Sequence, residues 1–300
     1  MAGQPVGLLG LLNVDKPGGL TSAAVVGRLR RSGGERRVGH GGTLDPLATG
    51  VLPIFFGRAT VLAEYLSVQG KAYRGDVVLG WTSTTDDAEG ALVPAPLSSP
   101  AEAADVAAAL APFVGEHLQA PPAFSAVKID GRRSYARARQ GEAPQPAPRP
   151  VRLDSARLLG LEQRDAGLTA VIEIECGAGY YVRALARDLG RALGGGAYLS
   201  GLRRTRVGPL RVEDAISLDA AEALGGELHT RLLSPLAAVG NMLEVAVLPT
   251  DEGRLAHGME VEAAVIGTGP AYARGDGDRV LAIGAVAGGR FRPHRLVDLG

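Results

Sequence analysis

The sequence of 300 residues contains a single cysteine, Cys176, and five histidines that show no HxxxH or HxH spacing. One cysteine cannot form an intrachain disulfide. The sequence also has neither a set of cysteines nor a suitably spaced pair of histidines that could bind a metal ion. Cys176 ends the alternating run Val171–Cys176, which is typical of a β-strand. We therefore expect Cys176 to pack as a small apolar residue rather than to act as a nucleophile, and we expect no metal site.

Long apolar runs are also missing, since none approaches the ~20 residues that a membrane-spanning helix needs. Residues 1–12 lack a basic segment and a signal-peptidase site, so we expect a cytoplasmic protein that does not enter a membrane. The hydrophobic content of 46% and the charged content of 21% are those of an ordinary globular protein. A chain of this length can bury one large core and still carry a small appended domain.

Lysine is scarce, because only three of the 32 basic residues are lysines, and 32 acidic residues bring the formal net charge to zero. A neutral total does not favour a nucleic-acid partner, but the arginines gather in short segments while acidic residues gather elsewhere. Segregated charge of this kind either presents a basic face to phosphates or forms a solvated surface. The arginine clusters are Arg28, Arg30, Arg31, Arg36 and Arg37, then residues 132–139, then residues 203–206.

Residue patterns over the first 235 positions predict a mixture of strands and helices. Strands are expected at 7–14, 51–56, 72–79, 151–161 and 168–176. Helices are expected at 23–31, with Thr21 or Ser22 as the cap, at 101–111 and at 181–193. Because these elements do not alternate as regular βαβ units, we expect an α+β fold with a mixed sheet.

The pattern changes near residue 235, where short β-like runs are separated by glycine-rich turns. These runs lie at 243–248, 261–266, 279–286 and 291–297. Such spacing predicts a small β-rich domain. We place the domains at residues 1–240 and 241–300.

The segment Gly39-His40-Gly41-Gly42-Thr43-Leu44-Asp45-Pro46-Leu47 holds the strongest candidate for chemistry, Asp45. Its carboxylate can cap its own backbone in an Asx turn before Pro46, or it can act as a nucleophile or base on a rigid loop. The glycines would let a substrate approach the backbone closely. A phosphate-binding loop is excluded, since the segment contains no GxxxxGK[ST] and no GxGxxG that opens a helix.

The region around Asp45, together with further blocks in order along residues 8–210, resembles the TruB family of tRNA pseudouridine synthases. The matching blocks are Leu11–Ser22, Val38–Pro53, Lys71–Arg74, Thr82–Gly90, Pro121–Arg137, Gly179–Arg183 and Leu202–Thr205. The resemblance implies an isomerase that converts uridine-55 in the T-loop of tRNA to pseudouridine without cofactor or metal. It also implies a mixed-sheet catalytic domain followed by a PUA-like RNA-binding domain. The expected partner is the tRNA T-arm stem-loop, and we expect a monomer with no obligatory protein partner.

The same resemblance assigns catalytic roles. Asp45 matches the family's essential aspartate, whose carboxylate acts on a flipped-out uridine. Tyr73 matches the tyrosine that stacks on the base, and stacking returns about 1–3 kcal/mol against a flipping cost of roughly a few kcal/mol. Arg183 matches the arginine that pairs with the catalytic carboxylate. Such a pair would keep Asp45 ionised, because a nearby positive charge lowers the pKa of a carboxyl group that burial would raise.

Further matched positions are implied to bind substrate. His40 matches a histidine that helps to hold the displaced nucleotide, while Tyr181 and Leu202 match positions that line the uridine pocket. The basic residues expected to contact RNA are Lys16, Lys71, Lys128, Arg203 and Arg204.

Two blocks depart from the family pattern. The usual G-H-T-G has Gly41 in place of the threonine. The usual S-K-G-T-Y reads Gly177-Ala178-Gly179-Tyr180-Tyr181, so that a lysine and two hydroxyl groups are missing. These changes concern RNA affinity and positioning rather than the carboxylate chemistry.

Two alternatives stay open beside the tRNA isomerase. One is a pseudouridine synthase of the guide-RNA-dependent archaeal and eukaryotic branch, which would need protein and RNA partners, although no long basic tail is present. The other is a non-catalytic RNA-binding module on the same scaffold, although Asp45, Tyr73 and Arg183 are all retained.

Overall fold

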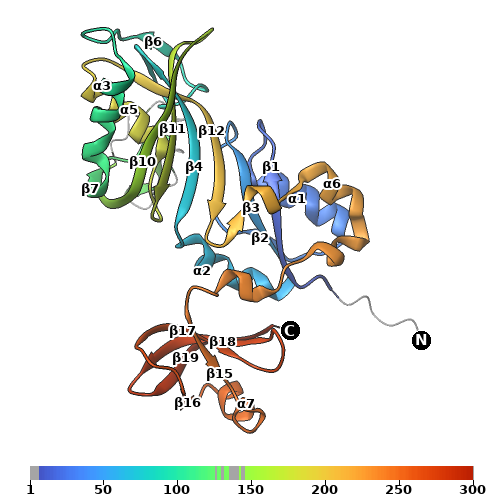
Figure 1. Cartoon of the computed structure of the whole chain (residues 1–300). Coiled ribbons are helices and arrows are strands. Elements are labelled where there is room, and N and C mark those ends of the chain that lie inside the picture. The colour runs from blue at the N-terminus through green and yellow to red at the C-terminus, as the bar shows by residue number, and fades with distance from the viewer. Residues whose placement is uncertain (1–6, 126, 130–131, 135–141, 143–145, 300) are drawn as a thin grey trace. The chain divides into compact units, whose positions relative to one another are not determined.

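The computed structural model describes residues 7–125, 127–129, 132–134, 142 and 146–299. It divides into two compact units, of which unit 1 comprises residues 1–46, 50–67 and 207–300, and unit 2 comprises residues 47–49 and 68–206. Both units combine strands and helices (Figure 1), so the expected α+β class is confirmed. The domain boundary predicted near residue 240 falls within unit 1 and stays a prediction.

The first sheet of unit 1 forms around β1 (Gly10–Lys16), a strand that is buried along almost its whole length. β1 pairs antiparallel with β3 (Thr49–Phe56) and parallel with β14 (Ile216–Ser217), and β2 (Val38–His40) pairs antiparallel with β3. The sheet is therefore mixed, as expected. β2 ends just before the loop that contains Asp45, and β3 begins just after it, so the sheet holds both ends of this loop.

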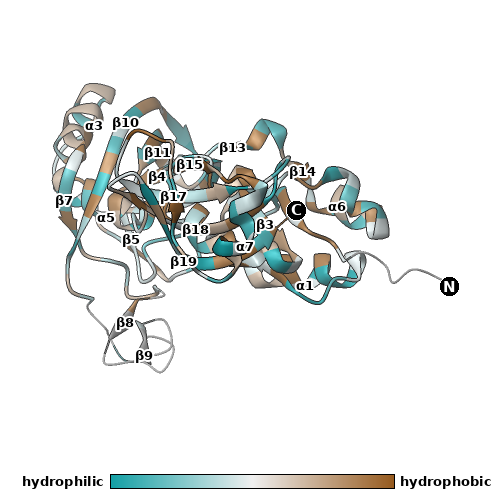
Figure 2. Ribbon diagram, turned by 90° about the horizontal axis from the view of Figure 1, so that it is seen from below, coloured by the Kyte–Doolittle hydropathy of each residue, from teal (hydrophilic) through white to brown (hydrophobic). Residues whose placement is uncertain are grey.

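Helix α1 (Ser22–Gly33) follows β1, and its cap is Thr21, whose hydroxyl oxygen accepts a hydrogen bond from the Ala24 N–H at 3.0 Å. One face of α1 is buried through Val25, Val26 and Leu29, and in Figure 2 both α1 and α6 (Leu218–Leu224) alternate between hydrophobic and hydrophilic residues. The further elements of this part are η1 (Gly57–Leu62), α2 (Ala63–Ser67), β13 (Leu210–Arg211), η3 (Val212–Asp214), η4 (Gly225–Arg231) and η5 (Pro235–Ala238).

The chain of unit 1 ends in a separate five-stranded sheet with the order β15-β17-β18-β19-β16. Its elements are β15 (Leu243–Ala246), α7 (Pro249–Ala256), β16 (Val261–Glu262), β17 (Gly269–Arg274), β18 (Val280–Ala287) and β19 (Arg290–Leu299). The expected β-rich C-terminal region is therefore present, although β17 was not predicted. Phe291 and Leu255 belong to a buried cluster of this sheet.

Unit 2 is built on strands in the order β12-β4-β11-β10-β7. These are β4 (Lys71–Leu79), β7 (Gly115–Gln119), β10 (Arg149–Arg164), β11 (Gly167–Cys176) and β12 (Ala197–Val207). β11 pairs antiparallel with β4 and with β10, and β10 pairs antiparallel with β7. The strands β7 and β12 were not predicted from the sequence.

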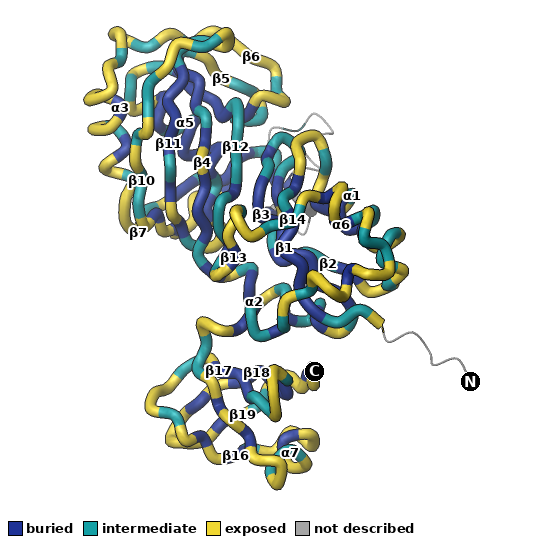
Figure 3. Tube along the Cα trace, turned by 45° about the vertical axis from the view of Figure 1, so that its right-hand side comes forward, coloured by how far each residue is buried: buried dark blue, intermediate teal, exposed yellow. Residues whose placement is uncertain are grey.

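Two helices of unit 2, α3 (Ala103–Leu110) and α5 (Val182–Ala192), pack against this sheet and against each other (Figure 1). Most residues of α5 are buried, and Figure 3 shows α5 and β11 largely in dark blue. The remaining elements are β5 (Trp81–Ser83), β6 (Leu92–Pro94), η2 (Ala111–Phe113), β8 (Lys128–Ile129) and β9 (Arg132–Arg133). None of the helices in the described part of the chain is long and apolar enough to span a bilayer.

Candidate active site

The residues on both sides of Asp45 are fixed by hydrogen bonds within unit 1. The Ser22 hydroxyl accepts from the Leu44 N–H at 2.8 Å and donates to the Leu44 carbonyl at 3.1 Å. The Pro46 carbonyl accepts from the Gly19 N–H at 2.8 Å and from the Lys16 ammonium at 3.3 Å. Asp45 itself is half-buried. Its carboxylate is therefore carried by a loop whose backbone is held at both neighbours, which restricts where the side chain can reach.

Lys16 contributes to this rigidity instead of facing solvent. Its side chain is fully buried, and its ammonium donates to the carbonyls of Pro17 at 2.8 Å and Leu20 at 2.7 Å as well as to Pro46. Three carbonyl acceptors compensate the charge that burial desolvates. This position does not fit the predicted phosphate contact, and we do not propose Lys16 as an RNA ligand.

His40 ends β2 and is half-buried, and the next residue is the unusual Gly41. The Gly41 N–H donates to the Pro53 carbonyl at 2.9 Å. A Cβ placed on Gly41 would lie 2.8 Å from Cε2 of Phe55, a fully buried ring of β3. The departure from G-H-T-G thus has a local cause, because the Phe55 ring fills the space that a threonine side chain would need.

In unit 2, Tyr73 lies on β4 opposite Ile174 of β11 and is 7% exposed. Lys71, two residues earlier on the same strand, is buried, and its ammonium donates to the Gln69 carbonyl at 2.9 Å. Burial, reinforced by the charge of Arg204, lowers the pKa of Lys71 to about 8. Arg204 is itself fully buried. Like Lys16, Lys71 and Arg204 lie away from the surface, which does not fit their predicted phosphate contacts.

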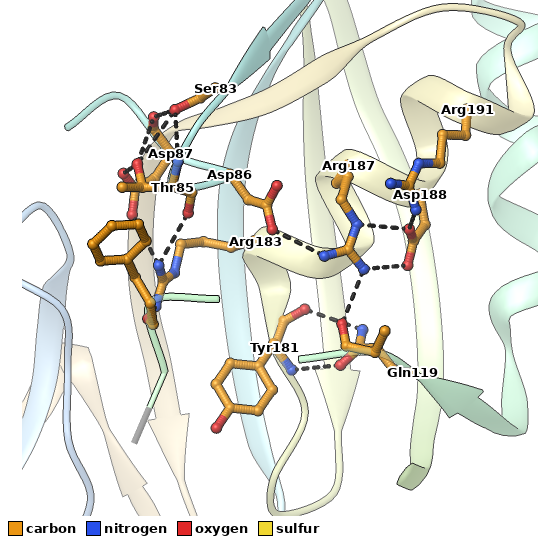
Figure 4. A network of polar contacts seen from close by, with 12 residues as sticks. Ser83, Thr85, Asp86, Asp87, Gln119, Tyr181, Arg183, Arg187, Asp188 and Arg191 are labelled. Atoms are coloured by element: carbon orange, nitrogen blue, oxygen red, sulfur yellow. Dashed lines mark hydrogen bonds and ion pairs between the residues drawn. The ribbon is translucent and has the colours of Figure 1, made fainter. Parts of the chain in front are cut away.

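Helix α5 presents Tyr181 and Arg183 at its N-terminal end (Figure 4). Arg183 is almost completely buried, and its guanidinium donates to the carbonyls of Thr85 at 3.1 Å and Phe124 at 2.9 Å. It also forms an ion pair with Asp87 at 3.3 Å, in which both side chains are shielded from solvent. Arg183 is therefore a fixed cation held by main-chain and carboxylate oxygens, not a mobile surface arginine.

Asp87 is held by the Thr82–Gly90 loop. Its carboxylate accepts from the Thr85 hydroxyl and from the Glu89 N–H, while its carbonyl accepts from the Ser83 hydroxyl. Gly90 closes this turn so tightly that a Cβ there would lie 2.4 Å from the Ser83 hydroxyl oxygen. The motif block includes this loop but does not connect Asp87 with Arg183, because only the tertiary fold places the loop beside α5.

A second layer of polar contacts continues along α5. The Arg187 guanidinium donates to Asp86 at 3.0 Å, to Asp188 at 2.9 Å and to the Ala120 carbonyl at 2.9 Å. Burial raises the pKa of Asp86, and the charge of Arg187 opposes this shift. Figure 4 shows the two arginines side by side on α5, each turned toward the loop that carries Asp86 and Asp87.

The other predicted positions of unit 2 lie on β12 and near β8. Leu202 and Arg203 are half-buried on β12, where the Arg203 guanidinium donates to the Thr49 hydroxyl at 3.3 Å. The backbone of Lys128 belongs to β8, but its side chain lies outside what the structure describes. The arginine cluster at residues 132–139 likewise has no described side chains.

The first arginine cluster contains one arginine that is paired with carboxylates and four that are exposed. Arg28 forms ion pairs with Asp219 and Glu222 of α6. The other members are exposed, and among the described residues none of their guanidinium groups forms an ion pair with a carboxylate, although the charge of Arg31 adds to the hydrogen bond from Arg28 in lowering the pKa of Glu222. We call this set the basic cluster, and it comprises Arg30, Arg31, Arg36 and Arg37.

Asp45, His40 and the basic cluster thus belong to unit 1, whereas Tyr73, Tyr181, Arg183 and Leu202 belong to unit 2. Within the described part of the chain, no three histidine, cysteine, aspartate or glutamate side chains gather as a possible metal-binding group.

Comparison with known proteins identifies the family to which this chain belongs. A family model described as TruB family pseudouridylate synthase (N terminal domain) matches residues 30–182, and one described as tRNA pseudouridylate synthase B C-terminal domain matches residues 183–252. The chain belongs to the TruB family. As a member of this family of pseudouridylate synthases, it is an isomerase that makes pseudouridine.

Relatives of this TruB-family chain support the assignment over most of its length. A protein from Aromatoleum aromaticum named tRNA pseudouridine synthase B is 42% identical over 96% of this chain and 92% of its own length. One of the same name from Gluconacetobacter diazotrophicus is 40% identical over 98% of both chains. One from Mycobacterium bovis is 46% identical over 70% of both.

Solved structures share the fold. The chain in "Crystal Structure of a Cbf5-Nop10-Gar1 Complex" superposes with a TM-score of 0.73 at 24% identity, covering 98% of this chain and 84% of that one. The chain in "Structure of H/ACA RNP bound to a substrate RNA containing 2'-deoxyuridine" gives 0.73 at 23% identity, covering 96% and 85%. At this identity the likeness concerns the architecture alone.

Proposed function

We propose that the protein isomerises uridine-55 in the T-loop of tRNA, with Asp45 as the carboxylate that acts on a flipped-out uridine. The observation that carries the proposal is the fixed Asp45 loop in a chain whose relatives, 40–46% identical, are named tRNA pseudouridine synthase B. A reacting group must be held in a productive geometry, and the bonds to Leu44 and Pro46 supply that restraint.

In the proposed reaction the N1–C1′ glycosidic bond of the uridine breaks, the base turns, and a C5–C1′ bond forms. The proton lost from C5 is balanced by the proton gained at N1, so that the product is an isomer. Asp45 either attacks the uridine or assists departure of the base. Tyr73, whose side chain is 7% exposed on β4, stacks on the flipped base.

Arg183 is proposed to pair with Asp45 through a charge-assisted contact. The guanidinium is suited to this role because Asp87, Thr85 and Phe124 already fix its orientation. We further propose that Tyr181 and Leu202 line the uridine pocket, that His40 holds the displaced nucleotide, and that Arg203 and the basic cluster contact RNA phosphates.

Tritium release from a T-arm stem-loop transcript labelled at uridine C5 tests the proposal. We expect release by the purified chain without any added protein or guide RNA. Asp45→Asn should abolish release while leaving RNA affinity within a few-fold of wild type. Asp165→Asn makes the same chemical change at an exposed turn between β10 and β11, and it should retain full activity.

A wild-type chain that releases tritium only with a guide RNA and partner proteins would overturn the tRNA assignment in favour of the guide-dependent branch. Turnover by Asp45→Asn near the wild-type rate would overturn the role of Asp45. Tyr73→Phe, which keeps the ring, should bind and flip the base with slowed chemistry, whereas Tyr73→Ala should lose the stacking energy. Equal behaviour of these two variants would contradict the stacking role.

A further inference from the structure

Gln119 makes a contact that no motif predicted. It is the last residue of β7, it is 3% exposed, and it pairs in register with Arg149 of β10. Its carboxamide oxygen accepts from the Tyr181 N–H at 2.9 Å, and its carboxamide nitrogen donates to the Tyr181 carbonyl at 3.1 Å. One side chain thus binds both main-chain groups of a single residue in a closed ring of two hydrogen bonds (Figure 4).

The clamped residue is the cap of α5. Tyr181 has an extended backbone conformation, makes no side-chain capping bond, and its carbonyl also accepts the first helical bond from the Leu185 N–H at 3.1 Å. The first N–H groups of a helix lack partners within the helix, so its N-terminal turn depends on contacts from outside. Gln119 provides such a contact at the point where the helix begins.

The neighbouring residues tie the same two segments together. Ala120 accepts from Arg187 and Phe124 accepts from Arg183, each through its carbonyl oxygen at 2.9 Å. Residues 119–124 are therefore joined to α5 at three points, and the contact made by Gln119 is the one to Tyr181. In Figure 4 the Tyr181 ring lies on the opposite side of its main chain from the Gln119 carboxamide. The carboxamide therefore holds the main chain of Tyr181 from the side away from the ring.

We propose that Gln119 is a positioning residue for the uridine pocket, acting by fixing the main chain of Tyr181 and the first turn of α5. This inference rests on the proposed function in assigning the Tyr181 ring to the pocket. A misplacement of about 1 Å by a remote change can cost roughly 100-fold in rate. The Tyr181 N–H depends on the clamp more than the Tyr181 carbonyl does, because the carbonyl also accepts from the Leu185 N–H and a buried main-chain N–H that loses its acceptor is destabilising.

Gln119→Met tests the clamp, because methionine retains the length of the side chain and loses both hydrogen bonds. We expect the single-turnover rate constant on the T-arm transcript to fall about 10-fold to 100-fold, with the dissociation constant for the RNA within about 3-fold of wild type. Gln163→Met, at an exposed position on β10, is the matched control and should react at the wild-type rate. Gln119→Glu keeps the acceptor for the Tyr181 N–H and should lie between wild type and Gln119→Met.

A double-mutant cycle with Tyr181→Leu separates positioning from a general loss of stability. If Gln119 acts through Tyr181, Gln119→Met should slow the Tyr181→Leu enzyme by less than about 3-fold, since interacting residues are non-additive. Additive effects, or a wild-type rate for Gln119→Met, would overturn the clamp while leaving the proposed function intact. Should Gln119→Met fail to fold, Gln119→Glu enters the same cycle with the same two outcomes. An inactive wild-type enzyme on the T-arm would instead contradict the proposed function.

Discussion

Adding one methyl group at Gly41 should destabilise unit 1, whereas adding it two residues earlier should not. In Gly41→Ala the new Cβ would lie 2.8 Å from Cε2 of Phe55, and at 3.5 Å from side-chain atoms of Leu66 and Pro53. In Gly39→Ala its nearest neighbour would be a methyl carbon of Thr60 at 3.7 Å, an ordinary van der Waals contact. Gly39 and Gly41 flank His40, and neither has a positive φ, so the two changes differ mainly in available space.

The magnitude follows from packing. Overpacking a fully buried ring costs about 1–3 kcal/mol, and replacing a glycine at a compatible position gains about 0.4–1 kcal/mol through the unfolded state. We therefore expect the free energy of unfolding to fall by about 1–2 kcal/mol in Gly41→Ala and to stay level or rise slightly in Gly39→Ala. Phe55→Leu should cost less stability in the Gly41→Ala background than in the wild-type background, because there it also removes the atoms that clash.

Far-UV circular dichroism during chemical denaturation is the suitable measurement, since the single tryptophan, Trp81, lies in unit 2 and does not report on Gly41. Equal midpoints for the two alanine variants would refute the reasoning that Phe55 excludes a side chain at Gly41. The reasoning would also be refuted if Phe55→Leu lowered the free energy of unfolding by the same amount with and without Gly41→Ala.

Three further outcomes follow from buried and exposed charges. Burial raises the pKa of Cys176 to about 12, so a thiol reagent at pH 8 should label the native protein about 1000-fold more slowly than the unfolded chain, and comparable rates would contradict this. Because the folded pKa of Lys71 is lowered to about 8 from 10.5, the unfolded chain binds more protons between those values. The free energy of unfolding of wild type relative to Lys71→Met should thus rise by about 2.5 kcal/mol from pH 7 to pH 10, whereas a constant difference would exclude the buried-charge explanation. Replacing two arginines of the basic cluster by glutamine should lower the slope of log affinity against log salt for the T-arm by about 0.7–0.9 per lost contact, while Arg152 and Arg157, already paired with Asp154 and Glu173, should matter less.

The sequence determined those features that depend on local pattern or on motif chemistry. Alternation and helical spacing predicted β4, β11, α1 and α5 to within a few residues, because each buries one face or both in a regular period. Capping chemistry predicted Thr21 or Ser22 as the start of α1, and Thr21 is the cap. Short β-like runs between glycine-rich turns predicted the C-terminal β-rich region. The ordered motif blocks predicted the TruB family, which the comparisons confirmed. The assignment of Asp45 as its catalytic carboxylate stays a prediction.

Only the tertiary structure decided which side chains face water and which face one another. Lys16, Lys71 and Arg204 resemble phosphate ligands in the sequence, yet each is buried, because carbonyl partners or the strand position enclose it. β7 and β12 carry too weak a pattern to predict, and so the contact of Gln119 with Tyr181 could not be expected. Asp87 and Arg183 are far apart in the chain, and their ion pair exists because the sheet of unit 2 places the Thr82–Gly90 loop beside α5. A sequence shows which residue types recur and at what spacing. A buried polar contact joins residues that are distant in the sequence, and they come within hydrogen-bond distance only when the chain folds.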